Sequence, residues 1–167
     1  FLGLLHRLDR PVQGIVLFAR TSKGAGRLSE QFRNHSIVKK YQALVTGRSP
    51  QSQGTLIHYL KKDETLNKTA AFDREVPGSL YAELSYAVKD SKGRYTLLDI
   101  ELKTGRPHQI RCQLSAIGCP IAGDLKYGAP AALPDKSIAL AAVSLSFETA
   151  TTHEPITITA EPRFITE

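Results

Sequence analysis

Alternation of apolar and polar residues along the chain predicts a protein dominated by β-strands. From Leu80 to Val88 every second residue is apolar, which is typical of a strand with one buried face. A turn at residues 90–93 and a second apolar stretch at 95–102 complete a predicted hairpin. We expect further strands at residues 14–20, 38–45, 55–60, 138–147 and 155–160.

Two segments have helical spacing instead. In the first, Ala25, Leu28 and Phe32 share one face of a predicted helix that Thr21 or Ser22 can cap. The second is predicted over residues 107–117, with a proline at its first position and a glycine just after its end. Its residues Ile110, Leu114 and Ile117 are expected to face the core.

Together these elements predict an α+β fold, with a mixed, mainly antiparallel β-sheet core and flanking helices. The 167 residues are enough for one domain with a sizeable core, so we expect a single domain over residues 1–167. Residues 47–54 are expected to form a loop, and residues 61–75 a charged, solvent-facing excursion with a short strand at most. Met is absent and residues 1–5 are apolar like a domain interior, so we expect further strands upstream.

Charge is concentrated near the N-terminus. The chain has 22 Lys and Arg against 16 Asp and Glu, but residues 1–50 alone carry 9 basic and 2 acidic residues. One sign of charge gathered in one region indicates a surface for polyanions. The alternative is a basic surface that serves solubility alone.

The two cysteines, Cys112 and Cys119, have neither a disulfide framework nor the spacing of a zinc site. No apolar run approaches the roughly 18 residues that a membrane-spanning helix requires, and no signal peptide is recognisable. We therefore expect a soluble, cytoplasmic protein that holds no metal.

Residues 6–9, His-Arg-Leu-Asp, place a carboxylate between Arg7 and Arg10, just before the apolar run 15–19. Nearby cations favour the ionised form of Asp9. An ionised carboxylate in a cationic pocket can act as a nucleophile or a base, while the cations hold phosphates. The alternative is that Asp9 is a turn residue before Pro11, loosely paired with its neighbours.

A second basic group lies about a hundred residues downstream. Arg106, His108 and Arg111 lie at or near the start of the second predicted helix, where free N–H groups and basic side chains attract anions. These residues could equally be ordinary surface cations.

Together, the two segments resemble the RluA-type family of RNA pseudouridine synthases. That family's first motif, His-Arg-Leu-Asp-x-x-Thr-Ser-Gly, corresponds to residues 6–14, with Val12 and Gln13 in place of Thr and Ser. Its arginine motif, Thr-Gly-Arg-x-His-Gln-Ile-Arg-x-x-Leu, corresponds to residues 104–114. A third match is the strand at residues 39–45, which is similar to basic-x-Tyr-x-Ala-Leu-Val.

The resemblance implies the pseudouridine synthase catalytic fold and assigns roles to nine residues. The catalytic residues would be Asp9, which acts at the ribose, Tyr41, which stacks on the base, and Arg111, which pairs with Asp9. Whether Asp9 attacks C1′ or removes the 2′ proton is left open. The substrate-binding residues would be His6, Arg7, Arg10, Arg106, His108 and Leu114.

The resemblance also implies the partners. The substrate would be ribosomal or transfer RNA with its target uridine flipped out of the stack, no cofactor or membrane would be needed, and the protein would act as a monomer. No S4-like RNA-binding module is recognisable in the sequence. Two other classes stay open: a non-catalytic RNA-binding or RNA-remodelling module on the same fold, and an unrelated carboxylate hydrolase. A hydrolase would require a second acid near Asp9, and residues 1–50 offer only Glu30.

Overall fold

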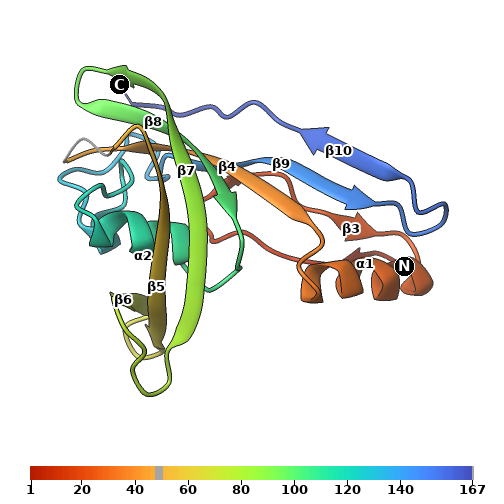
Figure 1. Cartoon of the computed structure of the whole chain (residues 1–167). Coiled ribbons are helices and arrows are strands. Elements are labelled where there is room, and N and C mark those ends of the chain that lie inside the picture. The colour runs from red at the N-terminus through yellow and green to blue at the C-terminus, as the bar shows by residue number, and fades with distance from the viewer. Residues whose placement is uncertain (48–50, 167) are drawn as a thin grey trace.

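The computed structural model describes residues 1–47 and 51–166. Its main element is an eight-stranded sheet in the order β10-β9-β4-β8-β7-β5-β6, with β2 paired to β9 beside this path (Figure 1). The β2–β9 pairing is parallel and the others are antiparallel, which confirms the predicted mixed, mainly antiparallel sheet. The strands are β2 Gln13–Gly14, β4 Val38–Val45, β5 Gln53–Asp63, β6 Lys68–Phe72, β7 Leu80–Lys92, β8 Tyr95–Leu102, β9 Leu140–Glu148 and β10 Pro155–Thr159.

The predicted hairpin forms from β7 and β8, and the alternation in β7 sets its faces. Leu84 and Tyr86 are buried, while Ser85 between them points to the other side of the sheet. Strand β8 has the predicted bounds, but β7 extends past Val88 to Lys92, so the turn falls at Gly93 and Arg94 rather than at residues 90–93. A β-bulge between Val88 and Asp90 lets the strand continue past the expected turn.

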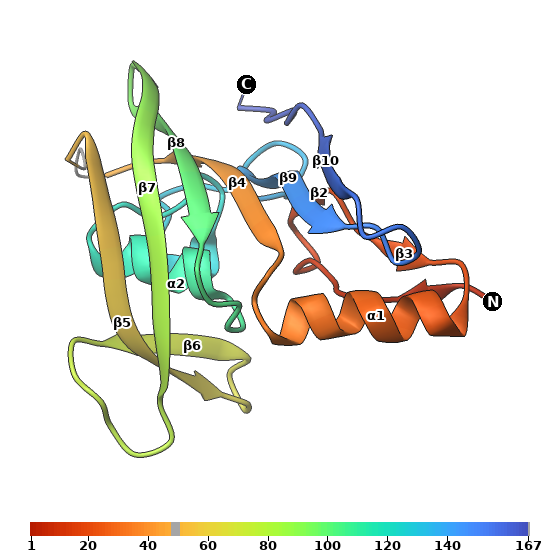
Figure 2. The same cartoon turned by 45° about the vertical axis from the view of Figure 1, so that its right-hand side comes forward.

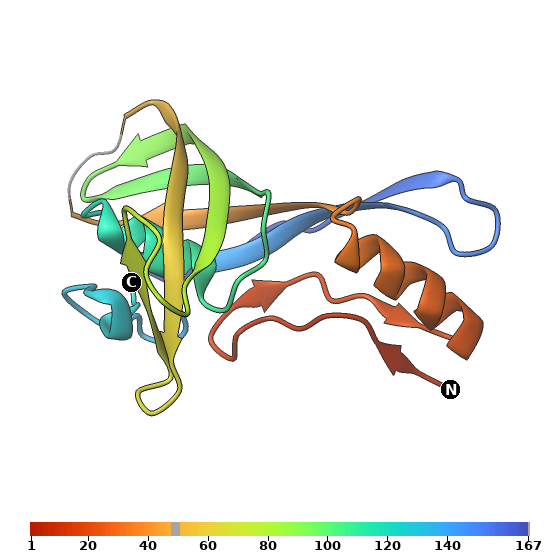
Figure 3. The same cartoon turned by 60° about the horizontal axis from the view of Figure 1, so that its bottom comes forward.

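Helix α1 (Ser22–Arg33) begins as predicted, because the Thr21 side chain accepts a hydrogen bond from the Gly24 N–H at 3.0 Å. Leu28 on its inner face is buried. The N-terminal segment runs alongside the helix, where the short strands β1 (Gly3–Leu4) and β3 (Phe18–Ala19) pair with each other (Figure 3).

The expected buried strand at residues 14–20 is wrong. Only β2 and β3 form there, at its two ends, and residues 15–17 between them belong to no strand. The reason is that the Leu17 N–H bonds the His6 Nε2, at 3.0 Å, instead of a neighbouring strand. Residues 48–50 of the expected loop 47–54 lie outside the described residues, and β5 already begins at Gln53.

Helix α2 (Gln109–Ala116) is shorter than the predicted 107–117 and does not begin with Pro107. Its end matches the prediction, because Gly118 takes a positive φ of 78° and the Cys119 N–H bonds the Leu114 carbonyl at 3.0 Å. All residues from Gln109 to Leu114 are buried, since the helix lies behind β5 and β7 (Figure 2). The first turn of α2 is therefore inside the protein, and this position decides the geometry of the site.

Candidate active site

A cavity of about 850 Å³ lies between the N-terminal segment, β4 and the loop before α2. It brings together eight of the nine residues that the sequence singled out, from segments a hundred residues apart. Asp9 is the only carboxylate among its lining residues in the described part of the chain. The eight residues are His6, Arg7, Asp9, Arg10, Tyr41, Arg106, His108 and Arg111.

Leu114 requires a correction, because it does not line the cavity. It is fully buried and packs in the core beside Ile110 and Leu84. It therefore holds α2 against the sheet and cannot contact a substrate directly.

Arg111 joins two carboxylates. Its Nε and Nη2 donate to the Oδ2 and Oδ1 of Asp124, at 2.7 and 2.9 Å, and its Nη1 donates to the Asp9 Oδ2 at 3.3 Å. The two-pronged contact fixes the plane of the guanidinium. Arg111 thus presents its remaining edge to Asp9 in a set orientation.

The Arg111–Asp124 pair is buried: Asp124 is 1% exposed and Arg111 6%. Burial alone would lower the pKa of Arg111, but the hydrogen bonds and charge of Asp124, together with Asp9, outweigh it and raise that pKa. The alternative that Arg111 is an ordinary surface cation is therefore excluded. Sequence reasoning assigned no role to Asp124, although a lone acid after the apolar residues Ile121 and Ala122 was a signal of a buried partner.

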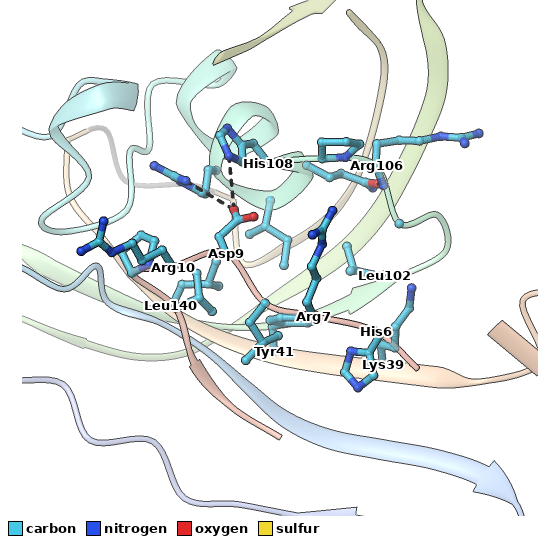
Figure 4. Close-up of a pocket in the computed structure, with 18 of the residues that line it drawn as sticks. His6, Arg7, Asp9, Arg10, Lys39, Tyr41, Leu102, Arg106, His108 and Leu140 are labelled. Atoms are coloured by element: carbon cyan, nitrogen blue, oxygen red, sulfur yellow. Dashed lines mark hydrogen bonds and ion pairs between the residues drawn. The ribbon is translucent and has the colours of Figure 1, made fainter. Parts of the chain in front are cut away.

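Asp9 is held through one oxygen. Among the described residues, Arg111 forms an ion pair with it and the His108 Nε2 lies 3.8 Å away, and both contacts fall on Oδ2 (Figure 4). Arg7 and Arg10, the flanking cations that the sequence suggested would favour the ionised form, make no ion pair with it within the described part of the chain. Its Oδ1 accepts no hydrogen bond from residues 1–47 and 51–166.

His108 has an unusual backbone conformation for a residue that is not glycine, with φ at 55°. It occupies the N-cap position of α2 without making a side-chain cap. Its Nδ1 instead lies 2.7 Å from the Tyr127 hydroxyl. Burial lowers the pKa of His108, although the charge of Asp9 acts in the opposite direction.

Tyr41 lies on β4, next to a β-bulge between Lys40 and Tyr41 in the pairing with β9. The bulge changes the direction of side chains at this point of the sheet, and Figure 4 shows Tyr41 near Asp9. Burial, and then the charge of Asp9, raise the pKa of Tyr41 to about 12. The phenol is therefore protonated in the free protein at neutral pH.

His6 lines the cavity, but its ring is already engaged. It stacks on Phe32 with ring centroids 4.8 Å apart, and its Nε2 accepts the Leu17 N–H. Burial, and then the charge of Lys39, lower the pKa of His6. His6 therefore braces the segment that carries Asp9.

The cations of the cavity come from more of the chain than the first fifty residues. Arg7 and Arg10 are exposed, and Figure 4 shows Arg7 and Tyr41 to one side of Asp9 and Arg10 to the other. Arg106 is anchored by a 2.9 Å bond from its Nε to the Tyr81 carbonyl. Three lysines also line the cavity: Lys39, which belongs to the basic first fifty residues, and Lys62 and Lys126, which no sequence pattern singled out.

The two departures from the family motif have structural partners. Val12 packs against the core. The Gln13 amide donates to the Arg163 carbonyl at 2.8 Å and accepts the Arg163 N–H at 3.0 Å. Gln13 thus ties the segment beside Asp9 to the C-terminal stretch.

Within residues 1–47 and 51–166, no group of three or more His, Cys, Asp or Glu side chains is arranged to bind a metal ion. In the same residues, neither helix has the length and apolar character needed to cross a membrane.

Comparison with known proteins identifies the family. Residues 1–116 match the RNA pseudouridylate synthase family. The tRNA pseudouridine synthase C of Vibrio cholerae is 36% identical over 134 residues, covering 74% of this chain and 54% of that protein. The ribosomal large subunit pseudouridine synthase C of Rickettsia prowazekii is 33% identical over 132 residues, covering 78% and 43%.

Two solved structures share the fold. Human RNA Pseudouridylate Synthase Domain Containing 4 superposes with a TM-score of 0.79 at 25% identity, covering 97% of this chain and 72% of that one. Human RNA Pseudouridylate Synthase Domain Containing 1 gives a TM-score of 0.82 at 22% identity, covering 96% and 69%.

These matches show that the chain belongs to the RluA-type family of RNA pseudouridine synthases. It spans about half the length of the curated relatives it matches.

Proposed function

We propose that this protein isomerises specific uridines in structured ribosomal or transfer RNA to pseudouridine, with Asp9 acting at the ribose. The reaction breaks the N1–C1′ bond, turns the base and joins C5 to C1′, while C5 loses a proton and N1 gains one. Product and substrate have the same atoms, so the chemistry requires no redox partner. It requires one carboxylate at the sugar and a site that holds the free base.

The observation that carries the proposal is that both contacts to the Asp9 carboxylate fall on one of its two oxygens. Arg111 and His108 both contact Oδ2, and Arg111 is itself fixed by the buried Asp124. Oδ1 is left to act on the sugar, either at C1′ or at the 2′ proton. An oriented, ionised carboxylate is what either route needs.

The target uridine must leave the stack before its sugar becomes accessible. A cavity of about 850 Å³ has room for a flipped nucleotide. Arg7 is exposed and lines this cavity, so we expect it to fill the vacated position in the RNA while the surrounding cations hold the phosphates.

We expect Tyr41 to stack on the flipped base. Its raised pKa keeps the phenol protonated while Asp9 carries its charge, so Tyr41 must lose this proton before it can accept the one from C5. A bond from Asp9 to C1′ would remove that charge and with it one cause of the raised pKa, which would ease this loss.

The other two classes fit the cavity less well. A binding module gains nothing from a carboxylate in the wall of a basic cavity, because that charge repels phosphate. A hydrolase would need a second acid, but Glu30 does not line this cavity, and Asp124 has both oxygens bound to Arg111.

The test is tritium release from tRNA and rRNA transcripts labelled at uridine C5. The purified protein should release tritium from at least one RNA, and Asp9→Asn should release none while binding that RNA with similar affinity. Normal release by Asp9→Asn would remove Asp9 from the mechanism. RNA binding without release by the wild type on any transcript would favour the binding module.

A further inference from the structure

Tyr127 connects three parts of the site, although the proposed chemistry gives it no role. It is 4% exposed, and its ring centroid lies 4.9 Å from the Arg111 guanidinium carbon. Its hydroxyl lies 2.7 Å from the His108 Nδ1 and accepts the Thr69 N–H at 2.8 Å. A buried hydroxyl with two such partners determines where the protons between them lie.

The direction of each hydrogen bond follows from the chemistry of the partners. A backbone N–H can only donate, so Thr69 uses one acceptor position of the phenol oxygen. Burial raises the pKa of Tyr127, so the phenol keeps its proton at neutral pH. That proton is then donated to the remaining partner, the His108 Nδ1. An Nδ1 that accepts leaves the proton of the neutral imidazole on Nε2.

We propose that Tyr127 is a positioning residue that fixes His108 as the neutral Nε2–H tautomer, so that an N–H rather than a lone pair faces Asp9 Oδ2 beside Arg111. The His108 Nε2 is the ring atom that faces Asp9, at 3.8 Å. As far as it concerns catalysis, this inference rests on the proposed function, because it assumes that Asp9 reacts. The tautomer itself does not depend on that assumption.

A neutral donor has a chemical advantage at this position. Arg111 already supplies one positive charge, and a second cation would draw more of the negative charge of Asp9 away from its reacting oxygen. The groups that face His108 are Asp9, Arg111, Lys126, Asp124 and the phenol. Burial, Arg111 and Lys126 disfavour an imidazolium at His108, whereas the carboxylates of Asp9 and Asp124 favour it. Tyr127 also disfavours the imidazolium, because its hydroxyl donates to Nδ1, the nitrogen that would have to take up the additional proton.

The same contacts hold the residue in a fixed place. The Thr69 Oγ1 donates to the Pro107 carbonyl at 3.0 Å, and the Ser115 Oγ donates to the Tyr127 carbonyl at 2.6 Å. Strand β6, the loop before α2 and α2 itself are thus bonded to one another around Tyr127. This explains how His108 keeps its left-handed backbone without a cap bond.

The experiment is nitrogen-15 NMR of the imidazole rings at neutral pH, in the wild type and in Tyr127→Phe. This variant removes the hydroxyl but keeps the ring beside Arg111. We expect His108 as the Nε2–H tautomer in the wild type and as a mixture of tautomers in the variant. His58 is the matched control, because its Nδ1 accepts from the Gln113 amide at 3.0 Å and its spectrum should not change. An Nδ1–H tautomer in the wild type, or an unchanged His108 in a folded variant, would overturn the proposal.

Single-turnover kinetics then tests the role in catalysis. Tyr127→Phe should lower the rate about fivefold, the size of one lost net hydrogen bond, with RNA affinity unchanged. It should also shift the acid limb of the pH–rate profile, which a purely structural loss would not move. If His108 shows the expected tautomer but the wild type forms no pseudouridine, the proposed function fails and the tautomer assignment stands. If pseudouridine forms and the variant keeps the wild-type rate and profile, the positioning role is wrong.

Discussion

Asp124→Asn removes the buried charge that holds Arg111, and its effect on stability can be worked out from the contacts. Asp124 is 1% exposed and accepts two hydrogen bonds, at 2.7 and 2.9 Å, from the same guanidinium. Breaking a buried ion pair from one side costs roughly 3–5 kcal/mol, because the remaining charge keeps its desolvation cost. Asp9 stays 3.3 Å from Arg111 and an asparagine can still accept one bond, so we expect the lower end, about 3 kcal/mol.

Urea unfolding followed by circular dichroism measures this loss. It is a large part of the roughly 5–15 kcal/mol that holds a typical domain together. The double variant Arg111→Met, Asp124→Leu is the matched control, since it removes both charges and should be more stable than Asp124→Asn alone. A loss below about 1 kcal/mol in Asp124→Asn would mean that the pair is solvated, and our view of how Arg111 is held would be refuted.

Three further predictions concern pH, salt and backbone. Burial lowers the pKa of His6, His58 and His108, so the unfolded chain binds more protons than the folded one below pH 6.5. The free energy of unfolding should therefore fall as the pH drops from 6.5, and a constant value down to pH 5.5 would contradict this. RNA affinity should fall steeply with salt, and Lys62→Gln at the cavity should flatten the slope of log affinity against log salt concentration by roughly 0.7–0.9, whereas Lys92→Gln, outside the cavity lining, should leave that slope unchanged. Equal slopes for the wild type and both variants would exclude the cavity as the docking surface. Gly14→Ala should lower the free energy of unfolding in urea by more than about 1 kcal/mol, because φ is +126° and the new Cβ would lie 2.3 Å from a backbone oxygen. Gly26→Ala, which adds a Cβ in open space on α1, should stabilise the protein instead, and the opposite order of the two variants would refute the argument.

The sequence predicted those elements whose pattern is local. The N-cap at Thr21, the bounds of β4 and the glycine after α2 all follow from residues within a turn or a strand. The start of α2 was wrong because proline at residue 107 suits a helix start, whereas the His108 contact with Tyr127 holds the preceding backbone in a left-handed turn. That contact joins segments that no local pattern connects.

The candidate site follows the same division. The order of the three motifs predicted that Asp9, Tyr41 and Arg111 share one site, and in the structure all three line one cavity. The partners Asp124 and Tyr127 were missed, because their roles depend on burial and on hydrogen-bond direction, which exist only in the fold.

The central claim is that Arg111 orients Asp9 for chemistry, and single-turnover rates on saturating RNA test it most directly. Arg111→Ala should lose turnover far more than RNA affinity, because Asp9 loses its main partner, 3.3 Å away. Arg111→Lys should restore little, since an ammonium cannot bond Asp124 and Asp9 with one rigid plane. An Arg111→Ala protein with an unchanged single-turnover rate and weaker RNA binding would make Arg111 a docking residue and would contradict the account.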